Sequence, residues 1–288
     1  MRLDERVAVV TGGGRGIGAA AAHALARKGR RLLLVSRTEA ELQGVRERIR
    51  ASGGVAEIAV ADVADAHSVD QLARRAHEVY GRVDILVNAA GVLGPVGPAW
   101  QVDSTEWVRT LHVNLVGTFL CCRAFLPEMM QRRWGRVVNF SGGGATSPLP
   151  GFSAYGASKA AVVRLSEILA EEVKEYDIQV NAVAPGLVDT RMQDGVLAAG
   201  DRAGGQFRRI QALRSTGAGG ASAELAAALV DFLVSQQSAG LTGKLIAAPY
   251  DGWQQWDAAR IHEIMAGPWF TLRRIDPHTL QAVVTRQE

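Results

Sequence analysis

A tyrosine and a lysine four residues apart are the side chains in this sequence best placed to do chemistry. Tyr155 and Lys159 stand in an alanine-rich stretch that predicts a helix, and residues at this spacing share one helix face within mutual reach. A free tyrosine titrates near about 10, too high for proton transfer at neutral pH. A neighbouring ammonium lowers that pKa, so the pair predicts Tyr155 as a general acid or base. For such a pair on its own, a solvated helix face is the alternative.

A glycine-rich segment near the amino terminus has the residues needed to hold a diphosphate. It lies between a short apolar run and an alanine-rich helix pattern. Glycines let the backbone approach a diphosphate closely, and the first turn of the helix offers free N–H groups and the positive end of its dipole. We therefore predict a dinucleotide site here. Its residues are Gly12, Gly14, Arg15, Gly16, Ile17 and Gly18.

The end of the second apolar run bears on which dinucleotide binds. A site for NAD usually has a carboxylate there, which accepts a hydrogen bond from the ribose 2′-hydroxyl. Here the run ends in Ser36 and Arg37, with no acid at its tip. Arg37 is able to bind a 2′-phosphate, with Arg15 approaching from the glycine loop; the alternative is two solvated arginines. We expect NADP(H) as the cofactor rather than NAD(H).

The elements that must position these residues alternate along the chain. Runs rich in Val, Ile and Leu alternate with amphipathic stretches, as in a parallel sheet covered on both faces. The predicted strands are Val7–Val10, Leu32–Ser36, Val55–Val60, Ile85–Asn88, Val137–Ser141, Gln179–Ala182 and Lys244–Ala248. The predicted helices are Gly16–Lys28, Glu39–Ala51, Ser68–Tyr80, Thr105–Arg132, Ala154–Glu175 and Ser222–Ser235. The pattern indicates an α/β fold with a doubly wound parallel sheet of about seven strands.

We expect residues 1–248 to form a single domain, because no linker interrupts the alternation before residue 190. Residues 192–221, rich in Gly, Ala and Arg, lack a clear period. They are predicted to be either a flexible surface loop or a lid over bound substrate, and their place after a strand favours the lid. Trp100 and Trp107 hint at a substrate with a sizeable apolar part.

Residues 249–288 form a carboxyl-terminal extension that is rich in tryptophan. Its large aromatic side chains do not suit a disordered tail, so we expect them to pack against the body or a partner subunit. These side chains are Trp253, Trp256, Trp269 and Phe270.

Composition limits the classes of partner. The 288 residues carry a net charge of +3 with no basic stripe, so nucleic-acid binding is not expected. No run of eighteen or more apolar residues suggests a membrane span, and the amino terminus lacks the apolar core of a signal peptide. We expect a cytoplasmic protein that binds a small molecule. Cys121 and Cys122 are predicted packing residues, and dispersed Cys and His predict no metal site.

The motifs together resemble the short-chain dehydrogenase/reductase family, in the right order and spacing over about residues 5–248. The resemblance implies a Rossmann-type fold and further cofactor contacts. Asp62 and Val63 match the pair that holds the adenine ring. Asn88-Ala89-Ala90-Gly91 is similar to the family's Asn-Asn-Ala-Gly segment, with Ala89 in place of the second Asn. The segment that meets the nicotinamide is matched by Pro185, Gly186, Val188 and Thr190.

The same resemblance implies the catalytic roles. Tyr155 exchanges the proton, Lys159 also holds the nicotinamide ribose, and Asn114 positions a water that links Lys159 to solvent. The implied reaction is NADPH-dependent reduction of a carbonyl, or the reverse oxidation of an alcohol. A lyase or isomerase that retains NADP(H), and a non-catalytic NADP(H)-binding protein, are the alternatives. The family also implies a homo-oligomer, dimer or tetramer, formed through helices Thr105–Arg132 and Ala154–Glu175.

One position departs from the family pattern. Members usually have a serine thirteen residues before the tyrosine, where it donates a hydrogen bond to the substrate carbonyl; here that position is Gly142. Ser141 is one residue early, and neighbouring side chains of a strand face opposite ways. The glycine-rich turn could still bring Ser141 inward. Another hydroxyl could also serve, or Gly142 makes room for a bulkier substrate. The other candidate hydroxyls belong to Thr146, Ser147 and Ser153.

Overall fold

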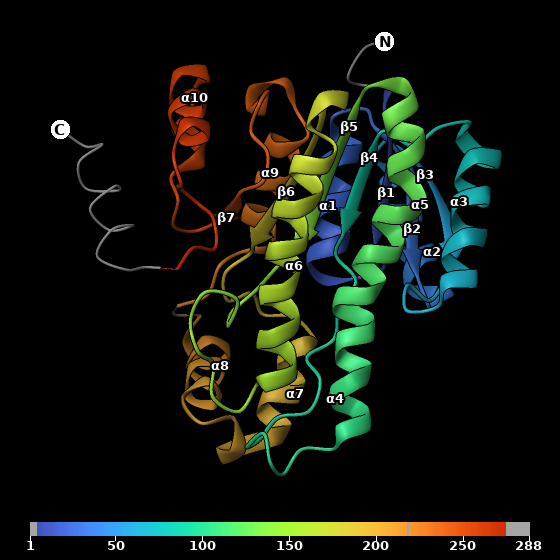
Figure 1. The fold of residues 1–288 in the computed structure, drawn as a ribbon. Coiled ribbons are helices and arrows are strands. Elements are labelled where there is room, and N and C mark those ends of the chain that lie inside the picture. Colours follow the sequence, from blue (N-terminus) through green and yellow to red (C-terminus); the bar gives the residue numbers. More distant parts are fainter. Residues whose placement is uncertain (1–4, 218, 275–288) are drawn as a thin grey trace.

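The computed structural model describes residues 5–217 and 219–274. Within them, seven parallel strands form one sheet in the order β3-β2-β1-β4-β5-β6-β7 (Figure 1). The strands are β1 (Val7–Thr11), β2 (Arg31–Ser36), β3 (Val55–Val60), β4 (Ile85–Asn88), β5 (Gly135–Phe140), β6 (Ile178–Ala184) and β7 (Leu245–Ala247). The predicted doubly wound α/β fold is confirmed.

Helices cover both faces of this sheet. On one face lie α1 (Gly16–Arg27), α2 (Glu39–Ala51) and α9 (Ala223–Leu233), and on the other lie α3 (Ala66–Tyr80), α5 (Gly117–Arg132) and α6 (Ser153–Glu172). Strand β2 shows why its run of residues is apolar throughout. Leu32 and Leu34 pack into the α1–α9 layer, whereas Leu33 and Val35 pack into the α3–α5 layer. Alternate side chains point to opposite faces, so a strand buried on both needs an unbroken apolar run.

The long helical run from Ser104 to Arg132, which ends in α5, is not a single α-helix. The sequence predicted one helix over Thr105–Arg132, but α4 (Ser104–Leu111) and α5 are joined by a π-helical segment, His112–Val116. Such segments insert one residue into a helix and recur at functional sites. The whole run from Ser104 to Arg132 is long and apolar enough to cross a membrane by length and composition. More than half of its most apolar window is buried inside this protein, as in the core helix of a soluble fold.

The glycine-rich region after β6 is helical. It forms α7 (Met192–Ala199) and α8 (Gly205–Thr216), joined by a short 3₁₀ turn, so the flexible-loop interpretation is wrong. Val196 of α7 and Ile210 of α8 share a small apolar cluster with Phe152, separate from the two sheet layers. Both helices lie beyond the carboxyl ends of the strands, at the bottom of Figure 1.

The carboxyl-terminal extension packs against the body as far as the described residues reach. After β7 it forms a 3₁₀ turn and α10 (Ala258–Ala266). Trp253 is buried, its indole N–H donates to the Ala248 carbonyl at 3.0 Å, and its ring lies 5.5 Å from that of Phe232 in α9. The rings of Trp256 and Phe270 pack in a tilted arrangement, with centroids 5.0 Å apart. Residues 275–288 of the predicted extension lie outside the described residues.

The extension then returns along β7. The backbone N–H of Leu245 donates to the Phe270 carbonyl at 2.7 Å, and that of Ala247 donates to the Asp251 carboxylate at 2.6 Å. Farther on, the N–H of Leu272 donates to Glu167 of α6 at 2.7 Å. The extension therefore joins β7 to α6.

Candidate active site

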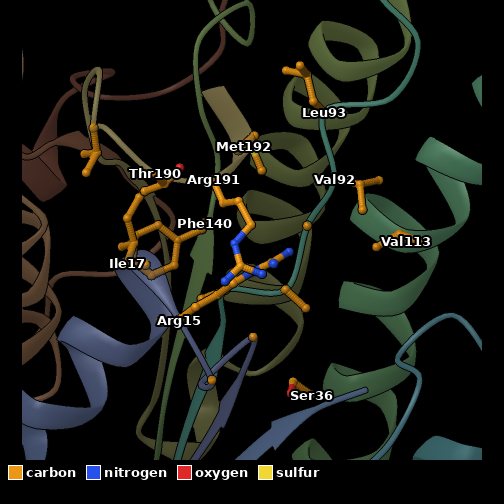
Figure 2. Close-up of a pocket in the computed structure, with 18 of the residues that line it drawn as sticks. Arg15, Ile17, Ser36, Val92, Leu93, Val113, Phe140, Thr190, Arg191 and Met192 are labelled. Carbon is orange, nitrogen blue, oxygen red and sulfur yellow. The ribbon is translucent and has the colours of Figure 1, made fainter. Parts of the chain in front are cut away.

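A cleft of about 690 Å³ lies at the carboxyl ends of the strands, between the glycine loop and α7 (Figure 2). It brings together most of the predicted site residues from segments far apart in the chain. Those that line it are Gly12, Gly14, Arg15, Gly16, Ile17, Gly18, Ser36, Arg37, Asp62, Val63, Ala89, Gly91, Ser141, Tyr155, Lys159, Pro185, Gly186, Val188 and Thr190. Asn88, Asn114 and Gly142 do not line it directly. Within residues 5–217 and 219–274, the cleft included, His, Cys, Asp and Glu form no group of three able to hold a metal ion.

The first turn of α1 is suited to an anion. Its N-cap residue, Arg15, makes no capping hydrogen bond and no acid stands in the first turn, whereas α3 begins with a capping aspartate, Asp65. Gly12 has a positive φ of 66°, and a Cβ added at Gly18 would overlap the Gly12 carbonyl. Glycine is therefore required for the loop to fold this tightly against the helix. The uncapped N–H groups and the helix dipole face the cleft, which fits the diphosphate of a dinucleotide.

The end of the cleft beside β2 is more acidic than predicted. Arg37 lies 3.9 Å from the Asp62 carboxylate, and Arg15 lies 3.5 Å from Glu41 in the first turn of α2. The sequence predicted Asp62 in the cofactor site but not Glu41, because the tip of the second strand carries no carboxylate. Glu41 reaches the cleft because α2 begins shortly after β2 and its first turn packs against the glycine loop. An acid in the first turn of the helix after β2 was the signal available in the sequence.

Asn88 is not placed as predicted. Its side chain is buried and points to the neighbouring strand and helix, where Nδ2 donates to Asn139 Oδ1 at 2.9 Å and to Cys122 Sγ at 3.5 Å. Cys122 and its neighbour Cys121 are buried packing residues, as predicted, and burial raises the pKa of both thiols. Asn88 therefore couples β4 to β5 instead of facing the cleft. In contrast, Asp62 does face the cleft, while its Oδ1 accepts the N–H of Ala64 at 3.0 Å.

Tyr155 and Lys159 face the same cleft from α6. The Lys159 ammonium donates to the Phe140 carbonyl at 2.8 Å and lies 5.7 Å from the centre of the Tyr155 ring. Burial lowers the pKa of Lys159 to about 8 and raises that of Tyr155 to about 12. The direction for Tyr155 is opposite to our prediction. Loss of hydration disfavours the phenolate, and it outweighs the effect of a lysine whose own charge is also disfavoured.

Asn114 lies behind the wall of the cleft, on the π-helical segment. Its side chain is fully buried: Nδ2 donates to the Val92 carbonyl at 2.9 Å and to Ser158 Oγ at 3.0 Å, and Oδ1 accepts the Val92 N–H at 2.8 Å. Gly91 lies between the Asn114 amide and the Lys159 ammonium. A Cβ added there would lie 3.2 Å from Asn114 Oδ1 and 3.5 Å from Lys159 Nζ. Asn114 thereby fixes the strand-end loop and α6 relative to each other.

Gly142 lies directly against the Tyr155 hydroxyl. A Cβ added at position 142 would overlap the phenolic oxygen and would lie 3.2 Å from the ring carbon that carries it. The tyrosine ring thus occupies the space that a side chain at 142 would need.

The candidate replacement hydroxyls are engaged or remote. Ser141 lines the cleft, but its hydroxyl donates to the Lys159 carbonyl at 3.2 Å, within α6. Ser153 accepts the indole N–H of Trp107 at 3.1 Å. Thr146 and Ser147 are exposed and do not line the cleft.

Part of the cleft is walled by apolar side chains. Figure 2 shows Val92, Leu93, Val113, Phe140 and Met192 around it. The two tryptophans that hinted at an apolar substrate do not contribute. Trp100 is 84% exposed and Trp107 packs away from the cleft.

Comparison with known proteins agrees with this geometry. Residues 6–199 match the model of the family described as short chain dehydrogenase. The short-chain reductase protein NovJ of Streptomyces niveus is 37% identical over 247 residues, which cover 84% of this chain and 92% of that protein.

Two solved structures share the fold over most of its length. An actinorhodin polyketide ketoreductase with NADPH is 30% identical with a TM-score of 0.79, covering 85% of this chain and 96% of the other. An NAD⁺-bound xylitol dehydrogenase is 27% identical with a TM-score of 0.80, covering 86% and 98%. The chain therefore belongs to the short-chain dehydrogenase family and is an oxidoreductase of the NAD(P)-dependent kind.

Proposed function

We propose that the protein is an NADPH-dependent reductase of carbonyl compounds, which also catalyses the reverse oxidation of the alcohol. The observation that carries the proposal is the position of Tyr155 and Lys159 in one cleft with the uncapped first turn of α1. The bound cofactor supplies the hydride. Tyr155 supplies the proton: its raised pKa keeps the hydroxyl protonated at neutral pH, and its transfer depends on Lys159 stabilising the phenolate that remains.

The remaining residues hold the reacting groups. Lys159, anchored on the Phe140 carbonyl, carries positive charge below about pH 8 and stabilises the phenolate left by proton transfer. Asn114 is a positioning residue, because its three hydrogen bonds join the Val92 loop to Ser158 of α6. With Gly142 in place of a hydroxyl donor, Tyr155 alone polarises the substrate oxygen. The apolar wall favours a substrate with an apolar group next to its carbonyl.

The proposed preference for NADPH rests on Arg15 and Arg37, which line the cleft together with Ser36. A guanidinium binds phosphate by paired, charge-assisted hydrogen bonds. We expect NADPH to bind at least about tenfold more tightly than NADH for this reason. Solved relatives include both NADPH and NAD⁺ complexes, so affinity measurement with this protein is the test.

Further proposals concern the whole chain. Residues 192–221 act as the lid over the substrate. This is supported by α7, whose first residues line the cleft.

The protein forms a homo-oligomer in the cytoplasm through α4, α5 and α6. This is supported by three large apolar side chains exposed on these helices, those of Val108, Phe119 and Ile168. Light scattering of the purified protein gives the number of copies.

The mechanism is tested by replacing the proton donor. Panels of carbonyls and alcohols are first screened with both cofactors to find an accepted substrate. We expect Tyr155→Phe, which keeps the ring but lacks the hydroxyl, to lower single-turnover hydride transfer by at least about 10², the usual contribution of a general acid. Unchanged cofactor affinity in the variant shows that the site is intact. Hydride transfer as fast as in the wild type would overturn the reductase mechanism.

A further inference from the structure

One carboxylate in the cleft bridges two arginines from segments far apart in the chain. Glu41 Oε1 lies 2.8 Å from the Arg191 guanidinium and 3.5 Å from that of Arg15. Arg15 belongs to the glycine loop, and Arg191 immediately precedes α7. Figure 2 shows the Arg15 and Arg191 side chains extending toward each other. Glu41 therefore connects the glycine loop to the segment that carries α7 and α8.

Glu41 stands at the corner of the cleft where the second ribose of a dinucleotide is proposed to lie. A Cβ added at Gly14 would lie 3.0 Å from Glu41 Cβ and 3.3 Å from Ser36 Oγ, so all three residues meet there. The Glu41 side chain is 21% exposed, against 56% for Arg15 and 63% for Arg191. The carboxylate is thus the more fixed member of the group, and the arginines are free to change partner.

We propose that Glu41 is a specificity-determining residue, which competes with the 2′-phosphate of NADP(H) for Arg15. The proposal rests on the proposed function only for the position of the adenine ribose beside Ser36. A 2′-phosphate carries more charge than a carboxylate and takes Arg15 as the stronger partner. Glu41 then keeps Arg191. With NAD(H) no phosphate is present, and the Arg15–Glu41 pair persists.

The consequence is that Glu41 weakens binding of a 2′-phosphorylated nucleotide and leaves binding of its unphosphorylated counterpart unchanged. Arg191 acts in the opposite sense, because it draws the Glu41 carboxylate away from Arg15 and neutralises it. Removing the charge of Glu41 and removing that of Arg191 should therefore change the ratio of the two affinities, phosphorylated to unphosphorylated nucleotide, in opposite directions. General damage to the site would instead lower both affinities together.

The test uses Glu41→Gln and Arg191→Gln in the full chain, with 2′,5′-ADP and 5′-AMP as probes in calorimetric titrations. In Glu41→Gln, we expect affinity for 2′,5′-ADP to rise about three- to tenfold, the size of a partly screened charge interaction, with 5′-AMP unchanged. In Arg191→Gln, we expect the ratio of the two affinities to fall. Glu39→Gln is the matched control, since Glu39 lies in the same first turn and pairs with Gln43 instead.

The outcomes separate this inference from the proposed cofactor preference. Unchanged affinity of Glu41→Gln for 2′,5′-ADP would overturn the inference, even if the wild type prefers NADPH. Loss of 5′-AMP affinity in Glu41→Gln would also overturn it, because Glu41 would then hold the 2′-hydroxyl. A wild type that prefers NADH, combined with the predicted gain in Glu41→Gln, would refute the preference and support the inference.

Discussion

At the residue scale, the position of the Tyr155 hydroxyl decides what position 142 can hold. Because the phenolic oxygen occupies the space of a Cβ at 142, the glycine is more than a missing donor. A side chain there must displace a partly buried aromatic ring that has few alternative rotamers. The position of the Tyr155 hydroxyl therefore depends on the absence of a side chain at position 142.

Gly142→Ser tests this arrangement. We expect it to slow single-turnover hydride transfer by about 10², since a displacement of about 1 Å at a reacting group has effects of that size. Gly142→Ala is the matched control, because it adds the Cβ without a hydroxyl. Equal losses in both variants indicate steric displacement. A Gly142→Ser enzyme faster than the wild type would show that the site only lacks a donor.

The shifted pKa values predict opposite pH profiles for the two directions. Tyr155, with its pKa raised to about 12, stays protonated at neutral pH, so alcohol oxidation should quicken as pH rises and the phenolate fraction grows. Carbonyl reduction should stay level below about pH 8 and decline above it, as Lys159 loses its proton. Steady-state kcat measured against pH in each direction checks both. In Lys159→Arg the decline near pH 8 should vanish, and a reduction rate that rises with pH would contradict the assignment.

At the element scale, the α7–α8 segment is secured by one arginine. Arg214 of α8 donates to Asp189, just before α7, at 3.0 Å and to Asp194 in the first turn of α7 at 2.7 Å. The two pairs hold α8 against α7 and against the segment that precedes α7, beside the cleft. The ion pairs therefore order α7 and α8 before a substrate binds.

Arg214→Ala should therefore raise KM for the carbonyl substrate about two- to fivefold, because exposed ion pairs of this kind contribute about 0.2–1 kcal/mol each. The dissociation constant of the cofactor should change less. Arg209→Ala, exposed on the same helix, serves as the control. Equal KM values in Arg214→Ala and the wild type would argue against a lid.

The elements also show what the sequence could predict. Strands such as β2 were found because burial on both faces demands an unbroken apolar run, and the glycine loop because its backbone geometry needs glycine. The π-helical turn at Asn114 was missed, since an apolar helix pattern does not reveal one inserted residue. Helices α7 and α8 were missed because they are short and their glycines hide the period. Glu41 was missed because the sequence marks it only as an acid in the first turn of the helix after β2, and its contact with Arg15 depends on how α2 packs.

At the scale of the whole molecule, the extension contributes to stability. Trp253 buries its ring against Phe232. Losing a buried aromatic side chain typically costs about 3–5 kcal/mol.

Truncation after Ala248 should lower the melting temperature by about 5–10 °C or change the oligomeric state. Trp253→Ala should reproduce much of the thermal effect, whereas Trp100→Ala, at an 84% exposed position, should not. Differential scanning calorimetry with light scattering measures both properties. A truncated chain with unchanged melting temperature and size would contradict a structural role for the extension.

The bonds from the extension to β7 have a second consequence, for solubility. The outermost strand of a sheet presents unpaired backbone groups that can recruit a strand from another molecule and start aggregation. Here the outward N–H groups of Leu245 and Ala247 are already taken by Phe270 and Asp251. At the opposite edge of the sheet, Arg50 Nε donates a hydrogen bond to the Ala56 carbonyl of β3 at 3.0 Å. Strand addition is thus obstructed at both borders, and at β7 the obstruction comes from residues beyond the sheet itself.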